Sequence, residues 1–404
     1  MTRNSSSDGV GLPDFFSHSV FVPADARQQV ADQLSAVISE AAAYTARFGG
    51  GAVDLVIAGS IARGEPAVRW NGSRYALASD IDFVAIADDP FDRQSFERGI
   101  VERAGAVDPT IVTTCFTVRR ARLPQVRSYF GADLVLGLDH RPVRSARLVC
   151  DWPPLRRREA LEVVVHQLAN YLLVQEPAGS TGQSERSGAE HKIRKLLLEA
   201  LQAVTQRPGQ RVKRYRELTG APALKTLGST LSAERIRHLV RGRDLSTKLM
   251  MSSGEAEQTV GALLARFLCP GAGEQAPAVL PTALTRLSDG RSDVLTIFQF
   301  ALISWFQLAK AQPYEQEYAV ILLRLWRQLD SAGLEHARHD QALLASLDAQ
   351  ELAQGAAEAL RLMERAMCSL RLDYYRLLGP RNFGEESSHA YQELDLADGG
   401  PRAR

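Results

Sequence analysis

Two aspartates in this chain, Asp80 and Asp82, have the type and spacing expected of a metal site. They are separated by one residue and lead into the apolar run 83–86, which predicts a buried strand. Side chains two apart in a strand point to the same face, so the two carboxylates would repel each other unless cations neutralise them. Carboxylate oxygens suit Mg²⁺, which also takes oxygens from a phosphate chain. The pair therefore predicts a metal site that accepts a phosphorylated ligand.

A Gly-Ser pair closes an earlier apolar run, residues 53–58, which also has the character of a strand. Gly59 allows the backbone to approach a ligand closely, Ser60 offers a hydroxyl, and Arg63 brings a positive charge. A helix that begins just after this pair would present free backbone N–H groups to an anion. These residues predict a binding site for phosphate groups.

The two motifs together resemble a known signature. GSIARG at 59–64 and SDIDFVAI at 79–86 are similar to the Gly-Ser turn and Asp-x-Asp strand of the DNA polymerase β-like nucleotidyltransferase superfamily, especially its minimal and aminoglycoside-modifying members. The resemblance covers about residues 50–150. It implies an enzyme that transfers a nucleoside monophosphate from an NTP to an acceptor and releases pyrophosphate. It also implies two Mg²⁺ ions, which Mn²⁺ can replace.

The resemblance implies a third carboxylate on a neighbouring strand. The expected strand, residues 110–118, contains no acid, so Asp108 just before it is the best candidate, although Pro109 restricts its backbone. The expected catalytic and metal-binding set is therefore Asp80, Asp82 and Asp108. Poorer alternatives for the third ligand are Asp133, Asp139 and Asp151.

Two lysines extend the expected nucleotide site beyond the first 155 residues. Lys192 lies in the run 191–195 at the expected start of a helix, where a positive charge is unfavourable unless an anion binds nearby. Lys213 occupies a position resembling a phosphate-contacting lysine of aminoglycoside adenylyltransferases. The expected nucleotide-binding set is Gly59, Ser60, Arg63, Lys192 and Lys213.

The spacer between the two motifs is unusually long, because Asp80 follows Ser60 by 20 positions. Short members of the family have about half that distance. Residues 65–78, with a Trp-Asn-Gly-Ser turn at 70–73, therefore predict an inserted hairpin or loop near the site.

Composition excludes several other classes of protein. Lys and Arg number 48 against 47 Asp and Glu, which removes the overall basic excess of a nonspecific nucleic-acid binder. The four cysteines form no C-x-x-C pair and the amino terminus carries no signal sequence, which predicts a cytoplasmic protein. The apolar run 297–308 is too short for a membrane span, so we expect a core helix or a partner interface, such as that of a homodimer.

The elements that must position these residues form two kinds of region. After a flexible start, 1–20, an α/β (α+β) nucleotidyltransferase domain with a mixed sheet flanked by helices is expected over 21–154. A large all-α region should follow, with a proximal helical domain at 155–268, a distal bundle at 280–380 and a disordered acidic tail at 381–404. Helical periodicity predicts helices over 155–175, 189–206, 233–250, 255–268, 292–310, 314–329 and 341–378, and the Gly/Ser-rich stretch 176–189 predicts a loop.

The function expected from these features is metal-dependent transfer of NMP, with AMP preferred, from an NTP to a hydroxyl or phosphate of a small-molecule acceptor. Two alternatives stay open. One is transfer onto tRNA, protein or a second nucleotide. The other is a catalytically degenerate nucleotide-binding regulator or scaffold, which the missing strand carboxylate permits.

Overall fold

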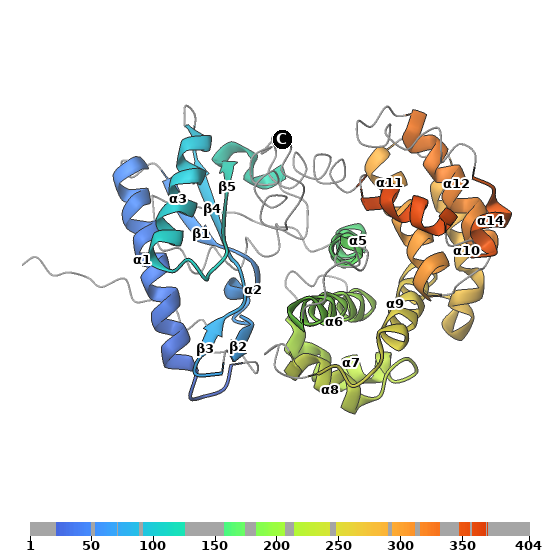
Figure 1. Ribbon diagram of the computed structural model, residues 1–404, viewed down its shortest axis with the longest axis horizontal. Coiled ribbons are helices and arrows are strands. Elements are labelled where there is room, and N and C mark those ends of the chain that lie inside the picture. The colour runs from blue at the N-terminus through green and yellow to red at the C-terminus, as the bar shows by residue number, and fades with distance from the viewer. Residues whose placement is uncertain are drawn as a thin grey trace, which may run out of the picture. The chain divides into compact units, whose positions relative to one another are not determined.

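The chain divides between Pro153 and Pro154 into two compact units, which are considered separately (Figure 1). The first is an α+β unit, and the described part of the second is helical, which matches the expected order of a small mixed sheet followed by a large α region. The expected flexible start, the acidic tail and Lys213 lie outside the described residues. The computed structural model describes residues 22–49, 53–70, 72–88, 92–125, 157–173, 183–206, 214–242, 248–289, 293–311, 316–331, 347–355, 358–368 and 370.

A three-stranded mixed sheet forms the centre of the first unit (Figure 1). Strand β1 (Val53–Ile57) pairs antiparallel with the central strand β4 (Ile81–Ala87), and β4 pairs parallel with β5 (Thr113–Arg119). Helices α1 (Arg27–Gly49) and α3 (Arg93–Val107) contact each other and the sheet, and their apolar side chains share one core with it. This arrangement brings the end of β1 beside the start of β4.

The long spacer forms the hairpin that the sequence predicted. Strand β2 (Val68–Trp70) pairs antiparallel with β3 (Tyr75–Leu77). At its base the Ala67 amide donates to Ser79 Oγ at 2.6 Å, and the Ser79 amide donates to the Ala67 carbonyl at 3.2 Å. Because Ser79 immediately precedes Asp80, the hairpin closes at the first residue of the expected metal site.

An ion pair joins the strands at the other end of the sheet. Arg120, which begins the 3₁₀ turn η1 (Arg120–Gln125), donates from Nη1 to Asp54 Oδ2 at 2.8 Å and from Nε to Asp88 Oδ2 at 3.2 Å. The Asp54 side chain on β1 is fully buried, whereas Asp88 is 65% exposed. Arg120 thus neutralises a carboxylate that the protein withholds from water.

The second unit packs its helices around α9 and α11. Helix α9 contacts α6 and α10, and α5 contacts α6 and α11, so helices on both sides of the turn after Leu268 pack together. The expected boundary between a proximal and a distal bundle falls inside this unit. The elements are α5 (Arg157–Leu173), α6 (Gln183–Thr205), η2 (Tyr215–Thr219), α7 (Ala221–Leu227), α8 (Ala233–Arg241), α9 (Ser253–Leu268), η4 (Gly273–Gln275), α10 (Ala276–Ser288), α11 (Val294–Phe306), η5 (Gln307–Ala311), α12 (Gln316–Ser331) and α14 (Ala349–Ala353).

Helix α11 and the π-helical turn η5 form the apolar centre of this unit. Among the described residues one segment, Val294–Ala311, is long and apolar enough to cross a membrane, and 78% of it is buried inside the protein. It contacts α5, α10 and α12, and η5 crosses α9 closely at Gly261, where an added Cβ would lie 2.4 Å from the Ala311 Cβ. The segment is therefore a core helix of this unit.

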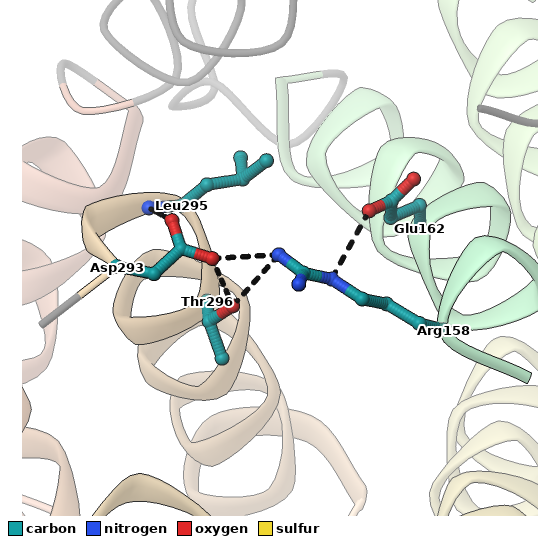
Figure 2. A network of polar contacts seen from close by, with 5 residues as sticks. All are labelled: Arg158, Glu162, Asp293, Leu295 and Thr296. Atoms are coloured by element: carbon teal, nitrogen blue, oxygen red, sulfur yellow. Dashed lines mark hydrogen bonds and ion pairs between the residues drawn. The ribbon is translucent and has the colours of Figure 1, made fainter. Parts of the chain in front are cut away.

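A polar network joins α5 to the start of α11 (Figure 2). Asp293 caps α11 by accepting from the Leu295 amide at 3.2 Å, and its Oδ2 accepts from Thr296 Oγ1 at 2.7 Å. Arg158 Nη2 donates to the same Oδ2 at 2.6 Å, and its Nε lies 3.6 Å from Oε1 of the buried Glu162. Arg158 therefore holds two carboxylates that belong to helices far apart in the sequence.

Asp293→Asn should lower stability at neutral pH and make no difference in strong acid. Partial burial alone would raise the pKa of Asp293, but hydrogen bonds from Thr296 and Arg158 outweigh it and place this pKa below its ordinary 3.8. A carboxyl with a lowered folded-state pKa stabilises the fold above its unfolded pKa, and this stabilisation is lost as pH falls through the folded value. We expect a difference in free energy of unfolding of about 0.5–1 kcal/mol at pH 7, because the pair is half exposed.

Asparagine also caps helices well, so this substitution removes the charge and keeps the cap. Thermal melts of both proteins between pH 7 and pH 2.5 measure the difference. A gap that stays constant over that range would show that the charge of Asp293 contributes nothing.

Three elements differ from the sequence-based expectations. Helix α6 begins at Gln183, so the predicted loop over 176–189 is wrong for its second half. Helix α10 was not predicted, because its Pro277 and Pro281 suggested a break, yet Pro277 stands in the first turn, where no N–H is needed. The predicted helix over 341–378 is interrupted at Gly355, whose φ of +69° ends α14.

Candidate functional site

The predicted metal ligand Asp82 lies directly against the Gly-Ser turn. Gly59 has a φ of +68°, and a Cβ at this position would lie 2.3 Å from Asp82 Oδ2. The Ala58 amide donates to the Asp82 carbonyl at 2.8 Å, which fixes the turn to the first residues of β4. Only glycine fits here, because the backbone is left-handed and the carboxylate fills the space of a side chain. The structure thus brings the two sequence motifs together.

Ser60 lies in this turn with its hydroxyl buried. Within the described part of the chain, Ser60 Oγ has no hydrogen-bond partner, although the residue is only 8% exposed. A buried polar group without a partner costs about 1–3 kcal/mol. A ligand oxygen that reached this hydroxyl would recover that energy.

The backbone of the turn also has donors to offer. Helix α2 (Gly59–Ala62) is one turn long, and its first bond runs from the Ala62 amide to the Ala58 carbonyl at 3.5 Å. The amides of Gly59, Ser60 and Ile61 precede that bond and are the open donors of a helix start. The helix has too few residues for a substantial dipole, so these three N–H groups, and not a macrodipole, are what the turn presents to an anion.

Asp80 completes the pair of carboxylates. It stands just before β4 and is exposed, and it makes no ion pair or hydrogen bond with any described residue. Asp82, two positions on, is half-buried and accepts a 2.7 Å hydrogen bond on Oδ1 from the Thr114 hydroxyl of β5. One carboxylate is therefore fixed by the fold and the other is open to solvent, and both lie at the same end of β4.

Arg63 is already paired inside the turn. Its Nε lies 3.9 Å from Oε2 of Glu65, whose side chain is fully buried, and the Glu65 amide donates to the Ser60 carbonyl at 2.9 Å. The predicted phosphate-binding role of Arg63 therefore competes with neutralisation of a buried acid. Arg63 and Glu65 also stiffen the turn that carries Ser60.

The described structure does not gather Asp108 with the other two carboxylates into a metal-binding group, so it gives no support to the predicted role of Asp108 as third ligand. Its Oδ1 accepts from the Thr110 amide at 2.9 Å and from the Thr110 hydroxyl at 2.6 Å, in the turn between α3 and β5. In the described ranges, no three His, Cys, Asp or Glu side chains lie close enough together to hold a metal ion. Asp108 shapes a turn, as an aspartate before a proline commonly does.

Thr114 occupies the position next to Asp82 on the neighbouring strand. The parallel register of β4 and β5 pairs these two residues directly. Sequence reasoning missed Thr114 because it searched this strand for acids, and the register that selects Thr114 over Thr113 was not known. The adjacent Cys115 is buried in the core, and burial raises the pKa of its thiol well above the ordinary value, so it is no nucleophile.

The two predicted lysines belong to the second unit of the chain, whereas the geometry described above belongs to the first. Lys192 lies on α6 in the second unit, nine residues after the helix begins at Gln183, and so it is not at a helix start. The reason for expecting an anion beside it therefore no longer holds. Lys213 lies outside the described residues and stays a prediction.

The donor set fits one divalent ion better than two. Mg²⁺ is commonly bound by one or two carboxylates, with phosphate and water oxygens completing its octahedron. Asp80 and Asp82 can supply those carboxylates, and the open amides with Ser60 can receive a phosphate chain on the adjoining turn. Among the described residues, two ions would have to share these same two side chains, because the alternative third ligands Asp133, Asp139 and Asp151 lie outside the described ranges.

Comparison of the chain with family models, with curated proteins and with solved structures found no match. The geometry of the first unit is therefore the basis for assigning a function.

Proposed function

We propose that the protein is a metal-dependent nucleotidyltransferase whose site lies where the Gly59 turn meets Asp82. One observation carries the proposal: the Asp82 carboxylate fills the space beside a glycine with positive φ, next to the buried Ser60 hydroxyl, which has no partner among the described residues. A carboxylate that lies against an anion-binding turn repels a phosphate, because both groups are negatively charged. The carboxylate can contribute to phosphate binding when a cation is coordinated by both groups, as in a metal-bound nucleoside triphosphate.

Each residue then has a role that follows from its position. Asp80 and Asp82 would hold Mg²⁺, which neutralises phosphate charge and lowers the pKa of the acceptor hydroxyl when bound. The amides of the turn and Ser60 would hold the β and γ phosphates. Thr114 keeps the Asp82 carboxylate in one orientation through Oδ1. Catalysis in such a site depends on positioning and charge neutralisation.

The preferred acceptor is a hydroxyl or phosphate of a small molecule, and the preferred donor is ATP. Transfer to tRNA, protein or a second nucleotide uses the same donor geometry. Only the identity of the labelled product distinguishes these acceptors from a small molecule. We place the reaction in the cytoplasm, since no disulfide is found at the described cysteines Cys115, Cys269 and Cys368.

Thr114 favours a second candidate function. Its hydroxyl, and not a carboxylate, is the neighbour of Asp82 across the strands. A site with two acids that binds a metal–nucleotide complex and turns it over poorly would serve as a nucleotide-binding regulator. Binding without transfer distinguishes this function from the first.

Incubation with each α-labelled NTP, Mg²⁺ or Mn²⁺ and a cell extract tests the proposal. The expected result is metal-dependent label in a small molecule, with RNA and protein fractions unlabelled. Metal-dependent NTP binding with no labelled product would support the regulator, and the absence of NTP binding would reject both.

Ser60→Ala should weaken binding of Mg²⁺-triphosphate about tenfold and leave nucleoside binding unchanged. Its hydroxyl is expected to contact phosphate oxygens only, and one hydrogen bond to a charged group contributes about 1.5 kcal/mol or more. Calorimetry with a non-hydrolysable ATP analogue and with adenosine measures both affinities. Ser73→Ala, on the exposed tip of the hairpin, is the matched control. Equal loss for both ligands would refute the assignment of Ser60 to the phosphates.

A further inference from the structure

The second unit contains a polar cavity that the proposed reaction does not use. It has a volume of about 470 Å³ and lies between α8, the turn at 229–230, one face of α9 and the start of α10. Volumes of this size hold small-molecule ligands. All of its lining residues belong to one unit, so its shape is defined within that unit.

Arg266 on α9 lines this cavity, and its hydrogen-bond partners among the described residues are all neutral groups. Its Nη1 donates to Ser229 Oγ at 3.0 Å and to Thr230 Oγ1 at 2.5 Å, and its Nη2 donates to the Thr226 carbonyl at 3.0 Å. No carboxylate of the described residues lies within ion-pair distance of it. The guanidinium is therefore fixed in position, and no carboxylate in the described ranges compensates its positive charge.

The same contacts leave donors available. Three of the five guanidinium N–H groups are used, so the Nε proton and one Nη2 proton remain for a ligand. Ser229 and Thr230 accept from Arg266 through their oxygens, and neither hydroxyl proton is donated to another group in the described part of the chain. A guanidinium and two hydroxyls that all have protons to give form a donor set for an oxygen anion.

The far end of the cavity has a different character. Glu255 stands eleven residues before Arg266 on α9, which is about 16 Å along a helix. Its carboxylate accepts from the Ser252 amide and hydroxyl, and these bonds keep its pKa below the ordinary value, so it stays ionised. Arg235 of α8 lies 3.8 Å from it. The lining as a whole carries two arginines and two glutamates, with Glu274 the fourth charge.

We infer that this cavity binds a small polar molecule through a single carboxylate or phosphoryl group at Arg266. The balanced charge of the lining disfavours polyanions such as nucleic acids or polyphosphates, because Glu255 and Glu274 would repel their further charges. The body of the ligand lies along the polar face of α9, past Gln258. This inference stands independently of the nucleotidyltransferase proposal.

Titration of the full-length protein with inorganic phosphate and with acetate, at ionic strength held constant with KCl, tests the inference. We expect saturable binding of at least one anion with a Kd in the millimolar range, read from ³¹P line broadening or from acetate saturation-transfer NMR. Arg266→Gln should weaken it about tenfold or more, whereas Arg237→Gln, on the exposed side of α8, should not. The anion that binds more tightly distinguishes a phosphoryl from a carboxylate ligand.

Two further variants keep the result interpretable. Thr230→Val removes one hydroxyl and should weaken binding with less risk to folding than loss of the arginine. Ser60→Ala reports whether phosphate instead binds at the Gly59 turn of the first unit. Absence of saturable binding of both anions, or binding that Ser60→Ala abolishes and Arg266→Gln and Thr230→Val leave intact, would overturn the inference.

Discussion

Asp82→Asn and Asp80→Asn should each reduce metal-dependent nucleotidyl transfer more than a hundredfold while the protein stays folded. Either change removes one of the two carboxylates that the described residues supply to the site, and a hundredfold corresponds to about 2.7 kcal/mol in the activation barrier. Folding should persist, because Asp80 is exposed and an asparagine at 82 can still accept from Thr114. Transfer of α-labelled NTP, with circular dichroism as the check on folding, measures the effect.

Asp108→Asn is the matched control for these variants. Its carboxylate accepts hydrogen bonds within its own turn, so its replacement should leave transfer near the wild-type rate. Mn²⁺ binding in the presence of NTP, followed by electron paramagnetic resonance, gives a readout that does not need the acceptor. Folded Asp82→Asn that binds Mn²⁺ and turns over normally would eliminate the metal assignment.

Arg120→Met should destabilise the first unit by about 3–5 kcal/mol. The substitution removes the cation that lies 2.8 Å from the fully buried Asp54 carboxylate, and loss of one partner of a buried ion pair is among the largest single costs in a fold. Hydrogen exchange of β1 and β5 peptides in the full-length protein measures the loss locally, so that unfolding of the second unit does not enter the result.

Asp88→Asn serves as the control on the same arginine. This partner is 65% exposed, so its neutralisation should cost about 0–1 kcal/mol. Adding Asp54→Asn to Arg120→Met should recover part of the loss, because an uncharged amide is less costly to bury. Equal losses of stability for Asp88→Asn and Arg120→Met would show that burial of Asp54 does not determine how much Arg120 stabilises the first unit.

Much of the first unit was predictable because its signals are local. The apolar runs at 53–58 and 83–86 predicted β1 and β4, and the Asn-Gly turn predicted the hairpin between them. The expected strand at 110–118 begins later, at Thr113, because Asp108 and Thr110 form a turn with their side chains. Such competition between side chain and backbone is invisible to hydrophobic patterning.

The site was less predictable than the fold. Asp82 and Gly59 were found from their types, but their contact depends on which residues of β1 and β4 lie side by side, which no local pattern fixes. Thr114 could be identified only from the register of the parallel strands β4 and β5, which are separated in the sequence by helix α3. The pairing of Arg63 with Glu65 was missed because Arg63, which lies near a phosphate-binding motif, was expected to contact the ligand and not a buried acid.

The closed base of the hairpin has a consequence for how this site can change over time. Ala67 and Ser79 each donate a hydrogen bond to the other. The eleven residues between them therefore begin and end at the same fixed point of the fold. Insertions or deletions within this hairpin need not move Asp80 or the Gly59 turn. Evolution, or an engineer, can therefore lengthen, shorten or replace the hairpin as a separate module while Asp80, Asp82 and the Gly59 turn stay in register.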